Sequence, residues 1–549
     1  PGLAATGPAP EWLARGTSPC CEVEDPLTRP GIDRPDDSAP PQMVLAERQH
    51  RVGEVVPPGH LVEHRGHFPR RFRQRCACHV PNISRSTCAV AKIATCSTSH
   101  KRCEGCHGSG CGDGRNLASV TLSPALRADY ALDDLPRLVV RTIEISDEIN
   151  LLDVLPATEA TTWLRRGEGF VGLGEAACLD VSGPDRFAVA DAWWSAVADA
   201  AAVRDEVGVP GTGLVAFGSF TFADDAGPSS LVIPRVVLGH RGNRYWITTI
   251  AEEPELPRVP APGSLVPASP PPRAPVNVTF ADGACTGAEW TRAVEAAVRR
   301  IEAGELDKVV LARDLLAVAS EPVDLRWPLR RLAERYPACW TYAVRGLIGA
   351  TPELLVRLDN GLVTSRVLAG TIRRSDDDAH DLALAASLAR SSKDLEEHEY
   401  AVRSVAEALA PHCSSMNVPE SPFVLHLPNV MHLATDLAGV LADTSTSLQL
   451  AAALHPSAAV CGTPTPVALR LISELERMNR GRYAGPVGWM DASGNGEWGI
   501  ALRCAQLDPA DPTRLRLFAG CGIVAGSVPE AELAEAQAKL VPIRDALTC

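Results

Sequence analysis

Apolar and polar positions follow regular periods only after about residue 120 of this 549-residue chain. Residues 185–207 carry the apolar stripe of a helix, and Gly242 with Asn243 gives a turn signal between two apolar runs, which predicts a β-hairpin. Alternating or glycine-bounded apolar runs predict strands at 138–145, 170–174, 214–220, 235–238 and 245–250. This stretch is therefore expected to form sheet with a helix between its strands.

The second half of the chain continues in the same way. Helical spacing is found at 287–303, 382–409 and 467–479, and a capping box from Ser527 to Glu530 is expected to open the last helix. Short strands are expected at 308–313, 485–490, 497–503 and 515–520. Because the strands follow one another in hairpins and do not alternate strictly with helices, the pattern predicts an α+β fold with mostly antiparallel sheets.

Composition divides the chain into four parts. Residues 1–118 are rich in Pro, Gly, Ser and Arg without a sustained period, so we expect a low-complexity extension that is disordered or not native. Residues 119–252 are expected to form the N-terminal part of a catalytic α+β domain. The proline-rich stretch 253–277 is expected to be a linker or surface loop, and 278–549 the main catalytic region.

The first 118 residues also contain nine of the 17 cysteines, which raises a metal-binding alternative. The candidate zinc ligands are Cys76, Cys78, His79, Cys103, Cys106, His107 and Cys111. Their spacing matches no complete four-ligand pattern, so zinc remains an alternative to the disordered extension. A zinc-containing regulator that binds nucleic acid would be the corresponding function.

Charge and hydropathy exclude several classes of protein. The formal net charge of −14 disfavours a general phosphate-backbone binder, so no nucleic-acid partner is expected from the chain as a whole. No run of 18 apolar residues occurs, so no membrane partner is expected either. Since no basic and then apolar leader is visible, we expect a cytoplasmic protein.

Lysine is rare here, with five lysines among 53 basic residues. Lysine can lose its proton when desolvated whereas arginine cannot, so the remaining lysines are candidates for chemistry. Lys308 begins an apolar strand and is a candidate general base, although a strand-end lysine can also extend into water. Glu397 stands in an acidic helix, and Glu535 shares a helix face with Lys539. Such carboxylates suit Mg²⁺, but they also form ordinary surface ion pairs.

Ordered motifs in the second half resemble the chorismate-utilising enzymes, in particular the isochorismate synthases. The resemblance covers about 240 residues, from Lys308-Val-Val-Leu-Ala-Arg313 to Lys539. Its motifs include Thr351-Pro-Glu-Leu-Leu355, Leu368-Ala-Gly-Thr371, Ser392-Lys-Asp-Leu-Glu-Glu-His398, His432-Leu-Ala-Thr435, Cys461-Gly-Thr-Pro464, Tyr483-Ala-Gly-Pro-Val-Gly-Trp489, Gly494-Asn-Gly-Glu-Trp498, Arg503-Cys504 and Gly520-Cys-Gly-Ile-Val524.

The resemblance implies the isomerisation of chorismate to isochorismate, in which water adds at C2 and the C4 hydroxyl leaves. Lys308 would be the base and Glu353 the general acid, with Mg²⁺ held by Glu397 and Glu535. His398 beside a ligand could orient it or be structural. The substrate-binding positions implied are Gly370, Thr371, His432, Thr435, Arg503, Gly520, Gly522 and Lys539. Relatives are commonly monomers, so a monomer is expected, and the product could supply either menaquinone or siderophore synthesis.

Two residues separate this chain from other branches of the family. Ammonia-using relatives usually carry glutamine where Lys308 stands, and aminodeoxychorismate synthases carry a nucleophilic lysine where this chain has Ala369. The resemblance therefore favours water over ammonia or an enzyme amine as the nucleophile. Salicylate synthases share the lysine and then eliminate pyruvate, so salicylate synthesis stays open as the alternative activity.

Overall fold

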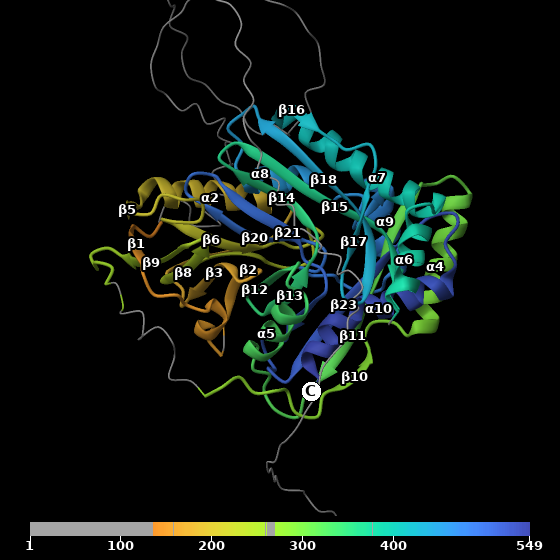
Figure 1. Cartoon of the computed structure of the whole chain (residues 1–549), viewed down its shortest axis with the longest axis horizontal. Coiled ribbons are helices and arrows are strands. Elements are labelled where there is room, and N and C mark those ends of the chain that lie inside the picture. The colour runs from red at the N-terminus through yellow and green to blue at the C-terminus, as the bar shows by residue number, and fades with distance from the viewer. Residues whose placement is uncertain (1–134, 158, 259, 261–269, 376, 549) are drawn as a thin grey trace, which may run out of the picture. The chain divides into compact units, whose positions relative to one another are not determined.

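The computed structural model describes residues 135–157, 159–258, 260, 270–375 and 377–548, and the predicted extension 1–118 lies outside this range. The described strands form two large sheets. Within each sheet neighbouring strands are antiparallel, except that β1 pairs with β5 in parallel. This confirms the expected α+β class with mostly antiparallel sheets (Figure 1). None of the described helices has an apolar stretch long enough to cross a membrane.

The first sheet, called sheet A below, has thirteen strands within the described residues. Its strand order, from edge to edge, is β10 (Thr279–Asp282), β11 (Lys308–Val318), β23 (Arg514–Ile523), β22 (Cys504–Leu507), β13 (Leu347–Thr351), β12 (Trp340–Val344), β2 (Thr161–Arg165), β3 (Glu168–Leu173), β8 (Val236–Arg241), β9 (Arg244–Glu252), β1 (Leu138–Ile145) and β5 (Ala202–Asp205), with the short β19 (Gly462–Thr463) paired to β11. Strands from before and after the proline-rich stretch thus share one sheet.

The second sheet, sheet B, has ten described strands. Their order is β16 (Cys413–Asn417), β18 (Val430–Leu441), β15 (Leu362–Arg373), β14 (Leu354–Asp359), β21 (Gly496–Ile500), β20 (Pro486–Asp491), β6 (Val215–Ser219), β7 (Ser229–Ile233) and β4 (Ala177–Val181), with β17 (Phe423–His426) also paired to β18. The chain passes from sheet A to sheet B between β13 and β14, which are separated by two residues.

Helices cover the outer faces of the two sheets. Helices α7 and α8 pack on sheet B, whereas α5, α9 and α10 pack on sheet A (Figure 1). The described α-helices are α2 (Arg186–Ala200), α4 (Gly287–Glu302), α5 (Arg326–Arg335), α6 (Asp378–Leu388), α7 (Ser392–Leu409), α8 (Ser447–Leu454), α9 (Thr465–Leu475) and α10 (Pro529–Leu547), and the short 3-10 helices are η1 (Leu151–Val154) and η2 (Ala410–His412).

Three predicted helix boundaries are wrong for local reasons. The helix expected at 382–409 is two helices, because the Ser391 side chain accepts from the Asp394 N–H and starts α7 anew. The helix expected at 185–207 ends at Ala200, after which β5 pairs with β1. The capping box at Ser527 is absent, since its hydroxyl accepts from the backbone N–H of Val524 and α10 begins two residues later.

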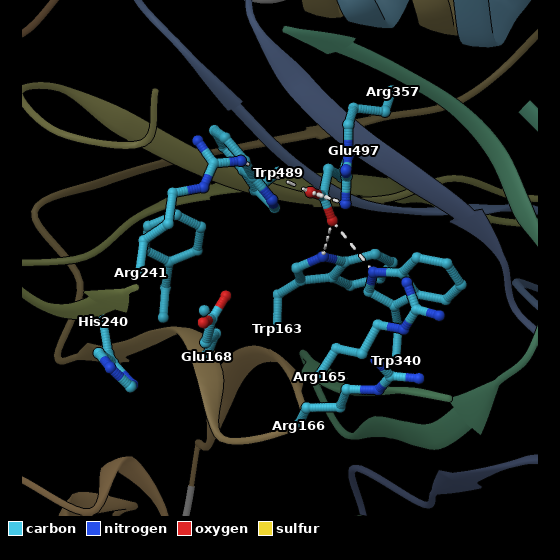
Figure 2. A pocket seen from close by; sticks show the side chains of 12 residues that line it. Trp163, Arg165, Arg166, Glu168, His240, Arg241, Trp340, Arg357, Trp489 and Glu497 are labelled. Atoms are coloured by element: carbon cyan, nitrogen blue, oxygen red, sulfur yellow. Dashed lines mark hydrogen bonds and ion pairs between the residues drawn. The ribbon is translucent and has the colours of Figure 1, made fainter. Parts of the chain in front are cut away.

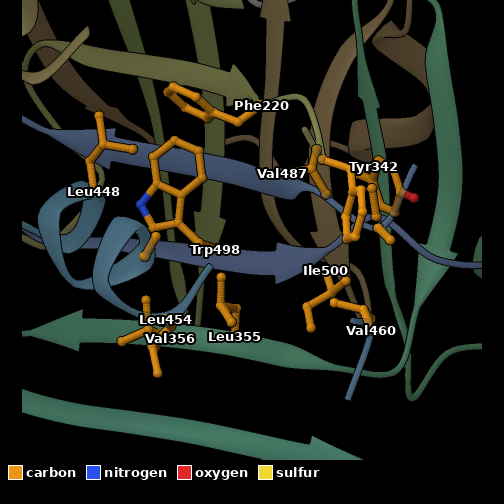
Figure 3. Close-up of a cluster of buried hydrophobic side chains, with 14 of the residues drawn as sticks. Phe220, Tyr342, Leu355, Val356, Leu448, Leu454, Val460, Val487, Trp498 and Ile500 are labelled. Carbon is orange, nitrogen blue, oxygen red and sulfur yellow. The ribbon is translucent and has the colours of Figure 1, made fainter. Parts of the chain in front are cut away.

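A tryptophan lies in the core that α8 covers on one face of sheet B. Trp498 on β21 is fully buried, lies near the end of α8 that carries Leu448, and faces Phe220 edge-on at 5.7 Å between ring centroids (Figure 3). Its indole N–H donates to the Ser447 hydroxyl at the start of α8. One side chain therefore joins sheet B to the helix that covers it.

We expect Trp498→Ala to lower the free energy of unfolding by about 3–5 kcal/mol, because a large buried ring is replaced by a cavity. Val440→Ala, at a position that is 51% exposed on β18 of the same sheet, is the matched control and should change it by less than about 0.5 kcal/mol. Denaturant titration of both variants measures the difference. Equal effects would show that Trp498 is not a packing centre.

Candidate active site

A small cavity lies where β11 and β23 of sheet A approach β15 and β18 of sheet B, with α7 and α10 alongside. Nine of the sequence-predicted site residues line it: Glu353, Gly370, Thr371, Glu397, His432, Arg503, Gly520, Gly522 and Lys539. The other three, Lys308, Thr435 and Glu535, each contact a residue of this group or its immediate neighbour. The structure thus brings together residues that are up to 231 positions apart in the sequence, from Lys308 to Lys539.

Lys308 is fully buried, so the alternative in which its side chain extends into water is wrong. Its Nζ lies 3.2 Å from Glu397 Oε1 and has no hydrogen-bond acceptor in good geometry among the described residues. Gly522, on the neighbouring strand β23, makes room for this pair, because a Cβ there would lie 2.0 Å from the Glu397 oxygen and 3.0 Å from Lys308 Cε. A fully buried amine with one charged neighbour remains the candidate for the role of base that the sequence predicts.

Glu353 lies in the two-residue connection from sheet A to sheet B and is 4% exposed. Burial raises the pKa of its carboxyl to about 7, while the Leu368 backbone N–H and the positive charge of Arg503 act in the opposite direction. The side chain can therefore hold a proton near neutral pH, which is what a general acid requires.

His432 connects two other predicted residues. It faces Thr371 across β15 and β18, where a bulge at Gly370 (φ 76°) interrupts the register. Its Nδ1 lies 3.0 Å from Thr371 Oγ1, and its Nε2 lies 3.1 Å from Arg503 Nη2. Because arginine only donates, Nε2 must accept, so a neutral His432 carries its proton on Nδ1 and donates to Thr371.

The environment of His432 agrees with this tautomer. Burial, and then the charges of Arg503 and Lys539, hold the pKa of His432 well below its usual range. The Thr371 hydroxyl, occupied as an acceptor, has its own proton free to donate into the cavity. Arg503 itself has a φ of 49°, a left-handed conformation that non-glycine residues rarely adopt and that is often found at functional sites.

Two acidic helices provide the candidate metal ligands. Glu397 belongs to α7 and Glu535 to α10, and the Glu535 carboxylate lies 2.6 Å from Lys539 Nζ. Among the described residues, the group with metal-ligand spacing is Cys521, Glu532 and Glu535, and Glu397 is not part of it. Burial, then the charges of Glu535 and other nearby groups including Glu397, raise the pKa of the Cys521 thiol well above its usual range.

These donors fit a hard divalent cation. Carboxylate oxygens are the ligands that Mg²⁺ prefers, whereas a protonated thiol is a poor ligand for it. Glu397 and Glu535 both act electrostatically on Asp394 between them, so they share one neighbourhood. Glu397 lines the cavity and Glu535 pairs with Lys539, which also lines it, whereas Glu532 pairs with Lys393 at 2.7 Å.

Several contacts were not foreseen from the sequence. Tyr483 is buried, lines the cavity and stacks on Phe518, although the sequence analysis gave its motif no role. His398 Nε2 lies 2.8 Å from Thr435 Oγ1, so these two side chains contact each other. Burial lowers the pKa of His398 to about 4. The sequence signal that could have identified Tyr483 is its position directly before the Ala-Gly-Pro turn.

Comparison with known proteins identifies the family. A family model described as chorismate binding enzyme matches residues 133–548 and includes all of the site. The chain belongs to the chorismate-binding enzyme family. Among curated members, isochorismate synthase DhbC of Bacillus subtilis is 43% identical over 263 residues, which is 46% of this chain and 65% of DhbC.

Two further comparisons extend the match within this family. Isochorismate synthase MenF of Bacillus subtilis is 36% identical over 263 residues, 47% of this chain and 55% of MenF. The aligned region therefore spans less than two thirds of either curated relative. The crystal structure of DhbC from Bacillus anthracis superposes with a TM-score of 0.59 at 32% identity, covering 72% of this chain and 98% of that one.

The raised pKa of Glu353 gives a prediction on stability. Well below pH 4.5 the Glu353 carboxyl is protonated in both the folded and the unfolded chain. As the pH rises from 4.5 to 7, the unfolded chain loses this proton, whereas the folded protein must either keep it or bury a charge. The free energy of unfolding of the wild type therefore falls over this range. Glu353→Gln removes this cost. We therefore expect the unfolding free energy of Glu353→Gln minus that of the wild type to increase by about 3 kcal/mol between pH 4.5 and pH 8.

Denaturant titrations of both proteins across this pH range measure that difference, in which the other titrating groups cancel. A difference that does not depend on pH would mean that Glu353 titrates normally in the folded protein.

Proposed function

We propose that this chorismate-binding enzyme is an isochorismate synthase. The observation that carries the proposal is the fully buried Lys308 amine beside Glu397, a residue that lines the same cavity as the proton-holding Glu353. Both curated relatives described above are named isochorismate synthases. A base and an acid in one small, largely enclosed site suit a reaction that removes a proton from water and returns one to a departing hydroxyl.

The proposed reaction exchanges hydroxyl groups on the ring of chorismate. Lys308 takes a proton from water, whose oxygen forms the new bond at C2. The double bonds shift, the bond from C4 to its hydroxyl breaks, and Glu353 protonates the departing oxygen so that water leaves. One water enters and one leaves, so the substrate and the product are isomers.

The remaining site residues would bind and orient the substrate. Glu397 and Glu535 are the proposed ligands of Mg²⁺, which supplies positive charge to the ring carboxylate when bound. Arg503 and Lys539 bring cations to the cavity, and Lys539 is held by Glu535 and by the Gly520 carbonyl at 3.1 Å. Thr371 donates its hydroxyl proton, as oriented by His432.

Other cavity residues support the proposed choice of water as nucleophile. Ala369 lines the cavity at the position where an enzyme amine would have to stand for covalent attack. Gly370, Gly520 and Gly522 also line the cavity, and a Cβ at any of them would meet neighbouring protein atoms, so these glycines allow the walls to pack closely. Thr435 is turned to His398 and is proposed to support the wall and not to contact substrate.

We expect Lys308→Ala and Glu353→Gln each to lower kcat by a factor of about 10²–10⁴, because each removes one of the two proton transfers. The exposed Arg514→Ala, on β23 next to the Lys308 strand, is the control that removes a cation from the same sheet without touching the cavity. Steady-state isomerisation of chorismate is measured with Mg²⁺ present, and thermal unfolding verifies that each variant is folded. A Lys308→Ala rate near that of the wild type would remove the lysine from the role of base.

Product analysis separates the proposed activity from salicylate synthesis, because both use the same lysine. We expect chorismate incubated with the enzyme to give isochorismate in reversible equilibrium, without pyruvate. Chromatography of the products and a coupled pyruvate assay make the measurement, with ammonium salts added in a parallel reaction. Accumulation of salicylate with equimolar pyruvate would assign the alternative activity, and an ammonia-dependent product would contradict both.

A further inference from the structure

A second cavity of about 330 Å³ lies between the two sheets and has no role in the proposed reaction. Its wall carries four arginines, Arg165, Arg166, Arg241 and Arg357, and two glutamates, Glu168 and Glu497 (Figure 2). Arg357 pairs with Glu497 and Arg241 pairs with Asp359 at 3.4 Å, whereas Arg165 and Arg166 form no ion pair among the described residues. A volume of this size is at the lower end for small-molecule sites.

Glu497 forms no ion pair with Arg165 or Arg166, because its carboxylate is held by other partners. One oxygen accepts from the indole N–H groups of Trp163 and Trp340, at 2.9 Å and 3.1 Å, and the other pairs with Arg357 at 2.6 Å (Figure 2). The Arg241 guanidinium lies 4.0 Å from that second oxygen, at the limit of an ion pair. Glu168 accepts from the backbone N–H of Gly242.

Arg165, Arg241 and Arg357 are also partly removed from water, whereas Arg166 is exposed. Burial, and then the nearby charges of Arg366, Arg166 and Arg357, lower the pKa of Arg165 to about 10. Its guanidinium lies 4.0 Å from the centre of the Trp340 ring and, among the described residues, donates one hydrogen bond, to the Ala338 carbonyl. Guanidinium groups that repel one another at a half-buried wall are costly unless an anion joins them.

Two buried polar atoms on the same wall have no partner among the described residues. They are the indole Nε1 of Trp489, whose side chain is 2% exposed, and the Nε of Arg357. Both are donors, and both belong to residues that line the cavity. A buried donor without an acceptor costs about 1–3 kcal/mol, so this wall carries unsatisfied donors in the same residues that line the cavity.

We propose that this cavity binds a small organic dianion. Arg165 and Arg166, which form no ion pair among the described residues, match two negative charges, and their planar guanidinium groups suit the paired oxygens of a carboxylate or a phosphate. A phosphate monoester and a dicarboxylate share this chemistry. The aromatic floor of Trp163, Trp340 and Trp489 leaves room for a short apolar spacer between or beside the acidic groups.

The test measures the binding of inorganic phosphate and of malonate by calorimetry, at constant ionic strength. We expect the double variant Arg165→Gln/Arg166→Gln to weaken binding of at least one of them by at least about tenfold. Arg292→Gln/Arg299→Gln, two exposed arginines on α4, is the control with the same change in charge and should bind as the wild type. Tighter binding of phosphate would identify a phosphate monoester, and tighter binding of malonate a dicarboxylate.

A crystal of the wild-type protein soaked in each anion gives an independent readout, which does not depend on the folding of a variant. Density between Arg165, Arg166 and Arg241 is the expected result. Density only beside Arg503 and Lys539 in the active-site cavity, or an equal loss of affinity in both double variants, would overturn the proposal. So would the absence of binding by either anion at millimolar concentration.

Discussion

The site depends on one buried ion pair. Lys308 can be fully buried because Glu397 lies 3.2 Å from its amine, and Glu397 can lie there because position 522 has no side chain. An unpaired buried charge would cost several kcal/mol, so in the substrate-free protein Lys308 and Glu397 each offset the cost of burying the other's charge. Since Gly522 pairs with Val310 in sheet A, the strand register also fixes where the pair is formed.

The same geometry gives Lys308 and Glu353 different surroundings. Lys308 is held by sheet A and faces a carboxylate, whereas Glu353 lies where the chain leaves sheet A for sheet B. Burial dominates at Glu353 and outweighs the more distant cations, so its pKa rises to about 7. The surroundings of the two side chains thus differ, because Lys308 has an opposite charge in contact and Glu353 has none at ion-pair distance among the described residues.

How much the sequence could predict depends on the range of the interactions involved. The strands around the Gly242 turn and the strand that begins at Lys308 were predicted from local periodicity, which is enough where one face is buried. The break at Ser391 was missed because a single capping hydrogen bond interrupts an otherwise continuous helical pattern. The family was predicted from ordered motifs and is confirmed.

Long-range contacts were beyond the sequence. Nothing local indicates that His432 lies between Thr371 and Arg503, or that Glu497 accepts from tryptophans 334 and 157 positions away. These contacts follow from which strands are neighbours in each sheet, and strand order cannot be read from periodicity. The second cavity was missed for the same reason.

The scarcity of lysine in the sequence pointed to the cavity region, whereas the spacing of the lysines along the chain did not. The described residues contain three lysines, and each forms an ion pair with a glutamate of α7 or α10: Lys308 with Glu397, Lys393 with Glu532, and Lys539 with Glu535. Arg503 adds a fourth cation and Asp394 a fourth carboxylate, so the charges around the cavity balance while Glu353 is protonated. A divalent cation alone, or a dicarboxylate substrate alone, would disturb this balance by two charges. Bound together they restore it, so under the proposed function the metal and the substrate should each favour the binding of the other.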